Sequence, residues 1–189
     1  MIKYIGNFAD WIQDEWITYL LNNSGTCFPV DATMEKEATI LNDFNGVTPA
    51  GDKIEGMEEL WDLDHVCCVT YKQHILPFKV DLPIDIQDSE YDWFFLKLTP
   101  GKVQPIHLDA AITGKEYAGG VAIPNTSVLR YWMPLQDYKR GHIFMYNDQN
   151  FTDYKKGDLF LHDGENVWHG AGNMGHVTRL SWNFEVYPK

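Results

Sequence analysis

Arg179-Leu180-Ser181-Trp182-Asn183-Phe184, near the C-terminal end of the chain, alternates polar and apolar side chains without a break. A period of two residues is typical of a β-strand, in which successive side chains point to opposite faces. The three apolar residues would then face a core, and the three polar residues would line the other face. If that other face is buried, Arg179 needs a partner such as a carboxylate. If it faces solvent, Arg179 needs none, and the pattern alone allows both.

Short segments with the character of strands recur through the second half of the chain, separated by Gly, Asp and Asn residues. Strands at this spacing predict a jelly roll or a barrel. We therefore predict a mainly β core over residues 91–187. The expected strands are 93–98, 103–109, 127–135, 142–147, 150–155, 158–162, 167–171 and 177–187.

Residues 1–90 are expected to support this core within a single domain, 1–189, because no linker or repeat interrupts the chain. Residues 7–22 place aromatic and aliphatic side chains near helical spacing, with Asn7 as a possible cap, which predicts an amphipathic helix packed on the core. A short helix or irregular cover is expected between Met34 and Phe44. Residues 66–71 have the β-branched and aromatic character of a strand.

Two histidines and an aspartate in the second half have the residue types of a metal site. His107 and Asp109 are one residue apart, so a strand through both would present them on one face. His169 is the distal histidine, and Arg179 follows it ten residues later. Two imidazoles and one carboxylate leave positions open for dioxygen and substrate, as in non-haem Fe(II) oxygenases. The His-x-Asp spacing is weak evidence by itself, and the distal residues carry most of the weight.

With these residues in this order, the chain from about residue 90 to 187 resembles the Fe(II)- and 2-oxoglutarate-dependent dioxygenases. It is most similar to small bacterial and phage members of the prolyl-hydroxylase and aspartyl/asparaginyl-hydroxylase kind. The resemblance implies a double-stranded β-helix, a cupin-like jelly roll with an N-terminal helix packed on it. It implies that His107, Asp109 and His169 bind Fe(II), and that Arg179 and Ser181 bind the C5 carboxylate of 2-oxoglutarate. It also implies hydroxylation of an amino acid or a protein side chain by O2, with succinate and CO2 as co-products.

Residues 129–135, LRYWMPL, are similar to an Arg-x-His-x-x-Leu strand of the same hydroxylases, but Trp132 stands where that pattern has histidine. Arg130 and Trp132 would share one strand face. We expect Arg130 to contact 2-oxoglutarate or a carboxylate of the main substrate, or else to be a surface or salt-bridging arginine. Residues 110–126 form a glycine-containing loop beside the proposed metal ligands and are a candidate lid.

Composition restricts the function further. The formal net charge is −12, which counts against nucleic-acid binding and favours a neutral or cationic main substrate. No apolar run reaches the roughly 20 residues that a membrane helix needs. The three cysteines suit neither a disulfide framework nor a zinc site, and the N-terminus has no secretory signal pattern. We therefore expect a cytoplasmic protein without a membrane partner.

Two other functions remain open at the level of sequence. One is a cupin-like metalloenzyme that does not use 2-oxoglutarate and so has no need of Arg179. The other is a non-catalytic jelly-roll binding module, with which the aromatic content of 14% is compatible. Among the remaining histidines, we expect His162 to orient a ligand through a hydrogen bond rather than to bind the metal itself.

Overall fold

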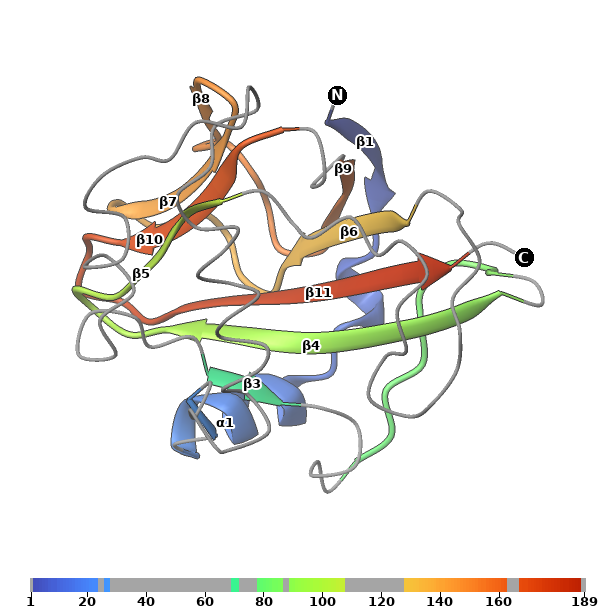
Figure 1. Cartoon of the computed structure of the whole chain (residues 1–189). Helices are drawn as coiled ribbons and strands as arrows, with labels where there is room; N and C mark the ends of the chain where they lie inside the picture. Colours follow the sequence, from blue (N-terminus) through green and yellow to red (C-terminus); the bar gives the residue numbers. More distant parts are fainter. Residues whose placement is uncertain are drawn as a thin grey trace, which may run out of the picture.

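The computed structural model describes residues 2–23, 26–27, 69–71, 78–86, 89–107, 128–162 and 167–187. The expected helix or cover at Met34–Phe44, the loop 110–126 and the proposed ligand Asp109 lie outside these residues. Within them, two antiparallel β-sheets face each other, and one α-helix lies on the outer face of the larger sheet (Figure 1). No helix in the described residues has the length and apolar composition to cross a bilayer.

The larger sheet has seven strands in the order β1-β9-β6-β11-β4-β3-β2. Their bounds are β1 Lys3–Asn7, β2 Thr26–Cys27, β3 Val69–Tyr71, β4 Glu90–Leu98, β6 Leu129–Pro134, β9 Asp158–His162 and β11 Arg179–Tyr187. The smaller sheet has four strands in the order β5-β10-β7-β8. These are β5 Val103–His107, β7 His142–Tyr146, β8 Gln149–Asn150 and β10 His169–Asn173.

From β4 onward the chain passes repeatedly between the two sheets. Strands β4, β6, β9 and β11 belong to the larger sheet, and β5, β7, β8 and β10 belong to the smaller one. This alternation of antiparallel strands is that of a jelly roll, in which two sheets enclose a common interior. The predicted fold class, a mainly β jelly roll with an N-terminal helix packed on it, is confirmed.

Strand β11 has the two faces that its sequence predicts. Its apolar residues Leu180, Trp182 and Phe184 belong to the core between the larger sheet and α1 (Asp14–Asn22). On the other face, Arg179 is 1% exposed and Ser181 is fully buried. Arg179 therefore lies in the interior between the sheets, and the hypothesis that it faces solvent is wrong.

Helix α1 is held on the sheet by aromatic packing and by a buried lysine. The Trp16 ring packs against the Phe95 and Trp182 rings of the larger sheet, with centroids 5.8 and 5.7 Å away. Lys97 Nζ, on the same outer face, donates hydrogen bonds to three carbonyl oxygens at the end of the helix, those of Leu20, Leu21 and Asn23, at 2.7, 3.1 and 2.9 Å. A cation at this end also compensates the helix dipole.

Three local predictions need correction. The predicted helix over 7–22 begins only at Asp14, because Asn7 ends β1 and residues Ala9–Trp11 form a 3-10 turn. The Asn7 side chain still accepts a hydrogen bond, at 3.0 Å from the Ala9 amide, so it stabilises this turn instead of the helix. The predicted strand over 150–155 is reduced to the two residues of β8, and the edge strand β1 was not predicted.

Candidate metal centre

The positions of His107 and His169 are brought together by the small sheet. β5 ends at His107 and β10 begins at His169, and the two residues are direct partners across this antiparallel pair. Tyr146 of β7 is the partner of His169 on its other side. Sixty-two positions of sequence separate the two histidines, so only the sheet register makes them neighbours.

The His169 side chain is held in one tautomer. It is 6% exposed, and its Nδ1 lies 3.1 Å from the Val167 carbonyl oxygen. A carbonyl oxygen only accepts, so Nδ1 carries the proton and Nε2 keeps its lone pair. A hydrogen bond from one ring nitrogen to a backbone carbonyl is a common way to orient a metal-binding histidine. His169 is therefore prepared to bind a metal ion through Nε2.

Asp109, the carboxylate of the predicted site, lies outside the described residues. Within the part of the chain that the structure describes, no three His, Cys, Asp or Glu side chains form a metal-binding group. The predicted ligand set stays a prediction. Of its three residues, the structure describes the backbone of His107 in β5 and the whole of His169.

A second imidazole, which the sequence analysis did not assign to the metal, lies against His169. His162 ends β9 in the larger sheet and is 8% exposed. The ring centroids of His162 and His169 are 5.2 Å apart, with 58° between the ring planes. The ring centroids of Tyr146 and His162 are 5.9 Å apart, with 82° between the ring planes. No sequence spacing signals this proximity, because the two histidines belong to different sheets.

Arg179 lies deeper in the interior, at the start of β11. Its guanidinium carbon is 5.7 Å from the centroid of the Trp132 ring, a distance suited to a cation–π contact. Trp132 is in turn stacked against Phe144, with ring centroids 4.0 Å apart. Ser181, two residues after Arg179 on the same face, accepts a hydrogen bond of 3.3 Å from Asn183 Nδ2. The arginine and serine predicted to bind one carboxylate thus share the buried inner face of β11.

A chain of hydrogen bonds runs from Tyr154 to the turn before β11. The positive charge of Arg179 lies close enough to the Tyr154 hydroxyl to affect its pKa. That hydroxyl is 3.4 Å from His142 Nδ1, and His142 Nε2 is 2.8 Å from the Val177 carbonyl oxygen. Because the carbonyl only accepts, Nε2 donates to it, and Nδ1 accepts the hydrogen of Tyr154.

Burial has the largest effect on the pKa values of Tyr154 and His142, the two titratable groups of this hydrogen-bond chain. It raises the pKa of the Tyr154 hydroxyl, and the positive charge of Arg179 partly opposes that rise. Burial also lowers the pKa of His142, and the charges of Arg179 and Lys139 lower it further, while the bond to Val177 acts in the opposite direction. The fold therefore favours a neutral tyrosine and a neutral histidine beside the buried guanidinium.

Arg130, the second predicted anion-binding residue, binds a carboxylate of the protein. It is 3% exposed, and its Nε donates to Glu185 Oε1 at 3.1 Å. The Tyr187 hydroxyl donates to the other oxygen of Glu185 at 2.8 Å. The salt bridge that the sequence analysis kept as the alternative for Arg130 is present. Its contact with a co-substrate stays a prediction.

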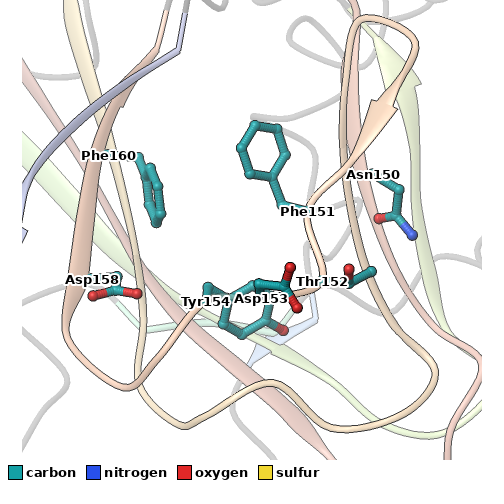
Figure 2. Close-up of a pocket in the computed structure, with 7 residues that line it drawn as sticks. All are labelled: Asn150, Phe151, Thr152, Asp153, Tyr154, Asp158 and Phe160. Carbon is teal, nitrogen blue, oxygen red and sulfur yellow. The ribbon is translucent and has the colours of Figure 1, made fainter.

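A hollow of about 290 Å³ opens beside the aromatic part of the interior and was not foreseen from the sequence. Figure 2 shows the rings of Phe151 and Phe160 on either side of it, with Tyr154 and Asp153 below them in that view. Tyr154 connects the hollow to Arg179. The carboxylate of Asp158 at its edge already accepts hydrogen bonds from Asn7 Nδ2 at 2.8 Å and from the Lys155 amide at 2.7 Å. Asp158 is therefore occupied in holding β1 and the turn before β9.

Neither protein-family models nor curated protein sequences match this chain. Among solved structures, a predicted oxalate decarboxylase from Thermotoga maritima is 16% identical, and the match covers 51% of this chain and 65% of that one, with a TM-score of 0.35. The Cupin_2 domain of an XRE-family transcriptional regulator from Enterobacter cloacae is 14% identical over 65% of this chain and 98% of that one, with a TM-score of 0.39. A cupin 2 conserved barrel domain protein from Salinispora arenicola is 8% identical over 62% of this chain and 74% of that one, with a TM-score of 0.34. Similarity this low assigns no activity to the chain.

Proposed function

We propose that this chain is a metal-dependent jelly-roll enzyme that binds one Fe(II) through His107, Asp109 and His169. We further propose that it is a 2-oxoglutarate-dependent dioxygenase that hydroxylates an amino acid or a protein side chain. The observation that carries the proposal is the register of the small sheet, in which His107 and His169 are direct partners.

The residues suit such an ion for four reasons. Positions directly opposite each other on antiparallel strands have Cβ atoms roughly 4.5–5.5 Å apart, close enough for two imidazoles to reach one ion. The Nδ1 bond of His169 to Val167 leaves Nε2 as the metal-binding atom. Asp109 follows His107 by two residues, so it joins the same face if the extended backbone continues. Imidazole and carboxylate are suitable donors for Fe(II).

The interior beside this site supplies the remaining roles. Arg179 and Ser181 would bind the C5 carboxylate of 2-oxoglutarate, because a buried guanidinium offers a planar fork and is only weakly screened by water. Trp132 and Phe144 exclude water from this part of the barrel. When bound, Fe(II) and 2-oxoglutarate would couple oxidative decarboxylation, which yields succinate and CO2, to insertion of an oxygen atom into the substrate.

The charge of the protein narrows the choice of main substrate. A net charge of −12 attracts cationic molecules, does not oppose the approach of neutral ones, and repels nucleic acid at long range. An amino acid, or a protein segment rich in lysine and arginine, is neutral or cationic and so suits this charge. We propose that the reaction takes place in the cytoplasm. 2-Oxoglutarate, itself an anion, would depend on local attraction by Arg179.

A second candidate is a cupin-like metalloenzyme that does not use 2-oxoglutarate. The observation that favours it is that both candidate anion-binding arginines already have partners inside the protein. Arg179 contacts the ring of Trp132 and lies near the Tyr154 hydroxyl, and Arg130 is paired with Glu185. Binding of a dicarboxylate would have to compete with these contacts.

Anaerobic calorimetric titration with Mn(II), and then with 2-oxoglutarate, tests the first candidate, with succinate production in air as the second measurement. We expect Mn(II) binding that is lost in His169→Ala and 2-oxoglutarate binding that is weakened in Arg179→Ala. Loss of a buried carboxylate–arginine pair costs about 2–5 kcal/mol. Arg140→Ala, at an exposed arginine, is the matched control.

The outcomes separate the alternatives. Mn(II) binding together with unchanged 2-oxoglutarate affinity in Arg179→Ala would reject the assigned role of this arginine. Mn(II) binding without any 2-oxoglutarate binding would favour the cupin-like metalloenzyme. If neither Mn(II) nor Fe(II) binds, both enzymes are excluded and a non-catalytic binding module remains.

A further inference from the structure

The strongest unassigned feature of the interior is the contact between His162 and His169. One imidazole comes from the larger sheet and the other from the smaller sheet, and they meet where β9 ends and β10 begins. Both are buried, at 8% and 6% exposure. The position of His107 lies next to His169 in the small sheet. His162 and His169, seven residues apart in the sequence, and the distant position of His107 therefore meet at one end of the barrel.

The separation of the two rings is the one that a shared ion requires. A metal bound to an imidazole nitrogen at about 2.0–2.1 Å lies roughly 3.2 Å from the ring centroid. Two such rings at angles between 90° and 109° about the ion then have centroids roughly 4.5–5.2 Å apart. The observed separation is 5.2 Å, with the ring planes inclined at 58°. The rings are therefore not stacked flat against each other, and their separation is compatible with one ion between them.

The charges around His162 also suit a cation. Arg130 is the cross-strand partner of His162, and its positive charge would oppose a nearby metal ion. However, Arg130 is paired with Glu185 at 3.1 Å, and that carboxylate neutralises it. The rings of Tyr146 and Phe144 also lie near His162, with centroid separations of 5.9 and 6.3 Å.

We propose that His162 is an additional protein ligand of the metal ion, next to His169 and His107. The inference rests on the metal site proposed above, but not on any use of 2-oxoglutarate. It replaces the expectation from the sequence that His162 only orients another ligand.

This ligand has a consequence for the reaction. A dioxygenase that uses 2-oxoglutarate needs free metal positions for both 2-oxoglutarate and dioxygen. If His162 bound the ion in addition to His107, Asp109 and His169, too few positions would be left for both. Detection of all four as ligands would therefore decide against the dioxygenase and for the cupin-like metalloenzyme, the second candidate above.

The test is NMR of the whole chain labelled with [15N]histidine, titrated with Zn(II) as a redox-inactive probe. A ring nitrogen that binds Zn(II) changes its chemical shift strongly, and correlation of each ring with its backbone assigns the signal to a residue. We expect direct Zn(II) shifts for ring nitrogens of His107, His162 and His169. This measurement uses the unmodified protein, so it decides the question even if a variant fails to fold.

The affinity of Zn(II) for variants gives the second measurement. His162→Gln should weaken Zn(II) binding by more than about 100-fold, beyond the 10–100-fold typical of residues that only orient a ligand. His142→Gln is the buried control, because its imidazole is bonded to Val177 and Tyr154. His176→Gln, at an exposed histidine, is the surface control. Both controls should bind Zn(II) within about threefold of the unmodified protein.

Each outcome has one meaning. Zn(II) shifts at His107 and His169 with an unchanged ring nitrogen at His162 would overturn this inference and leave the proposed metal site intact. The absence of shifts at all three would overturn the metal site and the inference together. A direct shift at His162, with the loss of affinity in His162→Gln, supports it.

Discussion

Replacing Lys97 by Met should destabilise the fold while leaving the metal centre unchanged. Lys97 is 8% exposed and lies on the outer face of β4, where its ammonium group donates to the carbonyl oxygens of Leu20, Leu21 and Asn23. The methionine side chain replaces most of the apolar stem but cannot donate a hydrogen bond. The carbonyls at the end of α1 would lose their common partner.

The size of the effect follows from these three contacts. A hydrogen bond to a charged group contributes about 1.5–3 kcal/mol, which sets an upper limit of roughly 4.5–9 kcal/mol for three. Two terms reduce it. Burial lowers the pKa of Lys97, which shows that its charge is costly to bury, and Leu21 and Asn23 are exposed, so water can satisfy their carbonyls. We expect a loss of about 2–3 kcal/mol, or about 5–10 °C in Tm.

Urea unfolding followed by tryptophan fluorescence and circular dichroism measures this loss. Lys79→Met is the matched control, because the Lys79 side chain is 75% exposed and pairs only with Asp81 at the surface. The control should change stability by less than about 0.5 kcal/mol. Zn(II) affinity should be the same in both variants. An unfolding midpoint of Lys97→Met equal to that of the unmodified protein would show that the helix is held by packing alone.

Three further predictions concern the interior and the turns. Burial lowers the pKa of His142 below 6.5, so below pH 6.5 the unfolded chain binds more protons than the folded protein. The stability that neutral His142 contributes is therefore present above pH 6.5 and is lost as the pH falls through the lowered pKa. Urea midpoints at pH 7.5 and 5.5 should differ more for the unmodified protein than for His142→Gln, and an equal difference in both proteins would contradict this. Gly157 and Gly101 both have positive φ angles, of +81° and +83°, but a Cβ at Gly157 would lie 2.3 Å from the Ala9 nitrogen and one at Gly101 would meet nothing within 4 Å. Gly157→Ala should therefore lower Tm several times more than Gly101→Ala, whose cost is about 1 kcal/mol, and equal losses would refute the close contact. A double-mutant cycle between Arg130→Met and Glu185→Gln should give a coupling of about 1–3 kcal/mol, whereas a value near zero would mean that their ion pair is not formed in solution.

The fold could be predicted largely from local patterns, since apolar and polar side chains alternate along a strand with one buried face. This held for β11, whose apolar residues lie on one face. In β4 a continuous apolar run predicted the strand instead, because both of its faces are buried. It failed at β1, because Lys3–Asn7 is exposed over most of its length and carries no alternation. It also failed at residues 7–13, where aromatic residues at helical spacing form a strand end and a 3-10 turn. Pairing with β9 decides that segment, and β9 lies some 150 residues away.

The residue types of the candidate site were visible in the sequence, but their neighbours were not. His107, His169 and Arg179 could be named because a metal site and an anion site need those side chains. The sequence could not show that Glu185 neutralises Arg130, or that Tyr154 and Trp132 contact Arg179. These contacts join strands whose order along the chain differs from their order in space.

By itself, therefore, the sequence determined which faces of the strands are apolar and which chemical groups the interior contains, because both follow from side-chain type and a period of two. The tertiary structure alone decided that His169 lies beside the position of His107 and against the ring of His162. Those neighbours depend on sheet order and register, which arise from pairing between distant segments. Long-range pairing leaves no local trace in the chain.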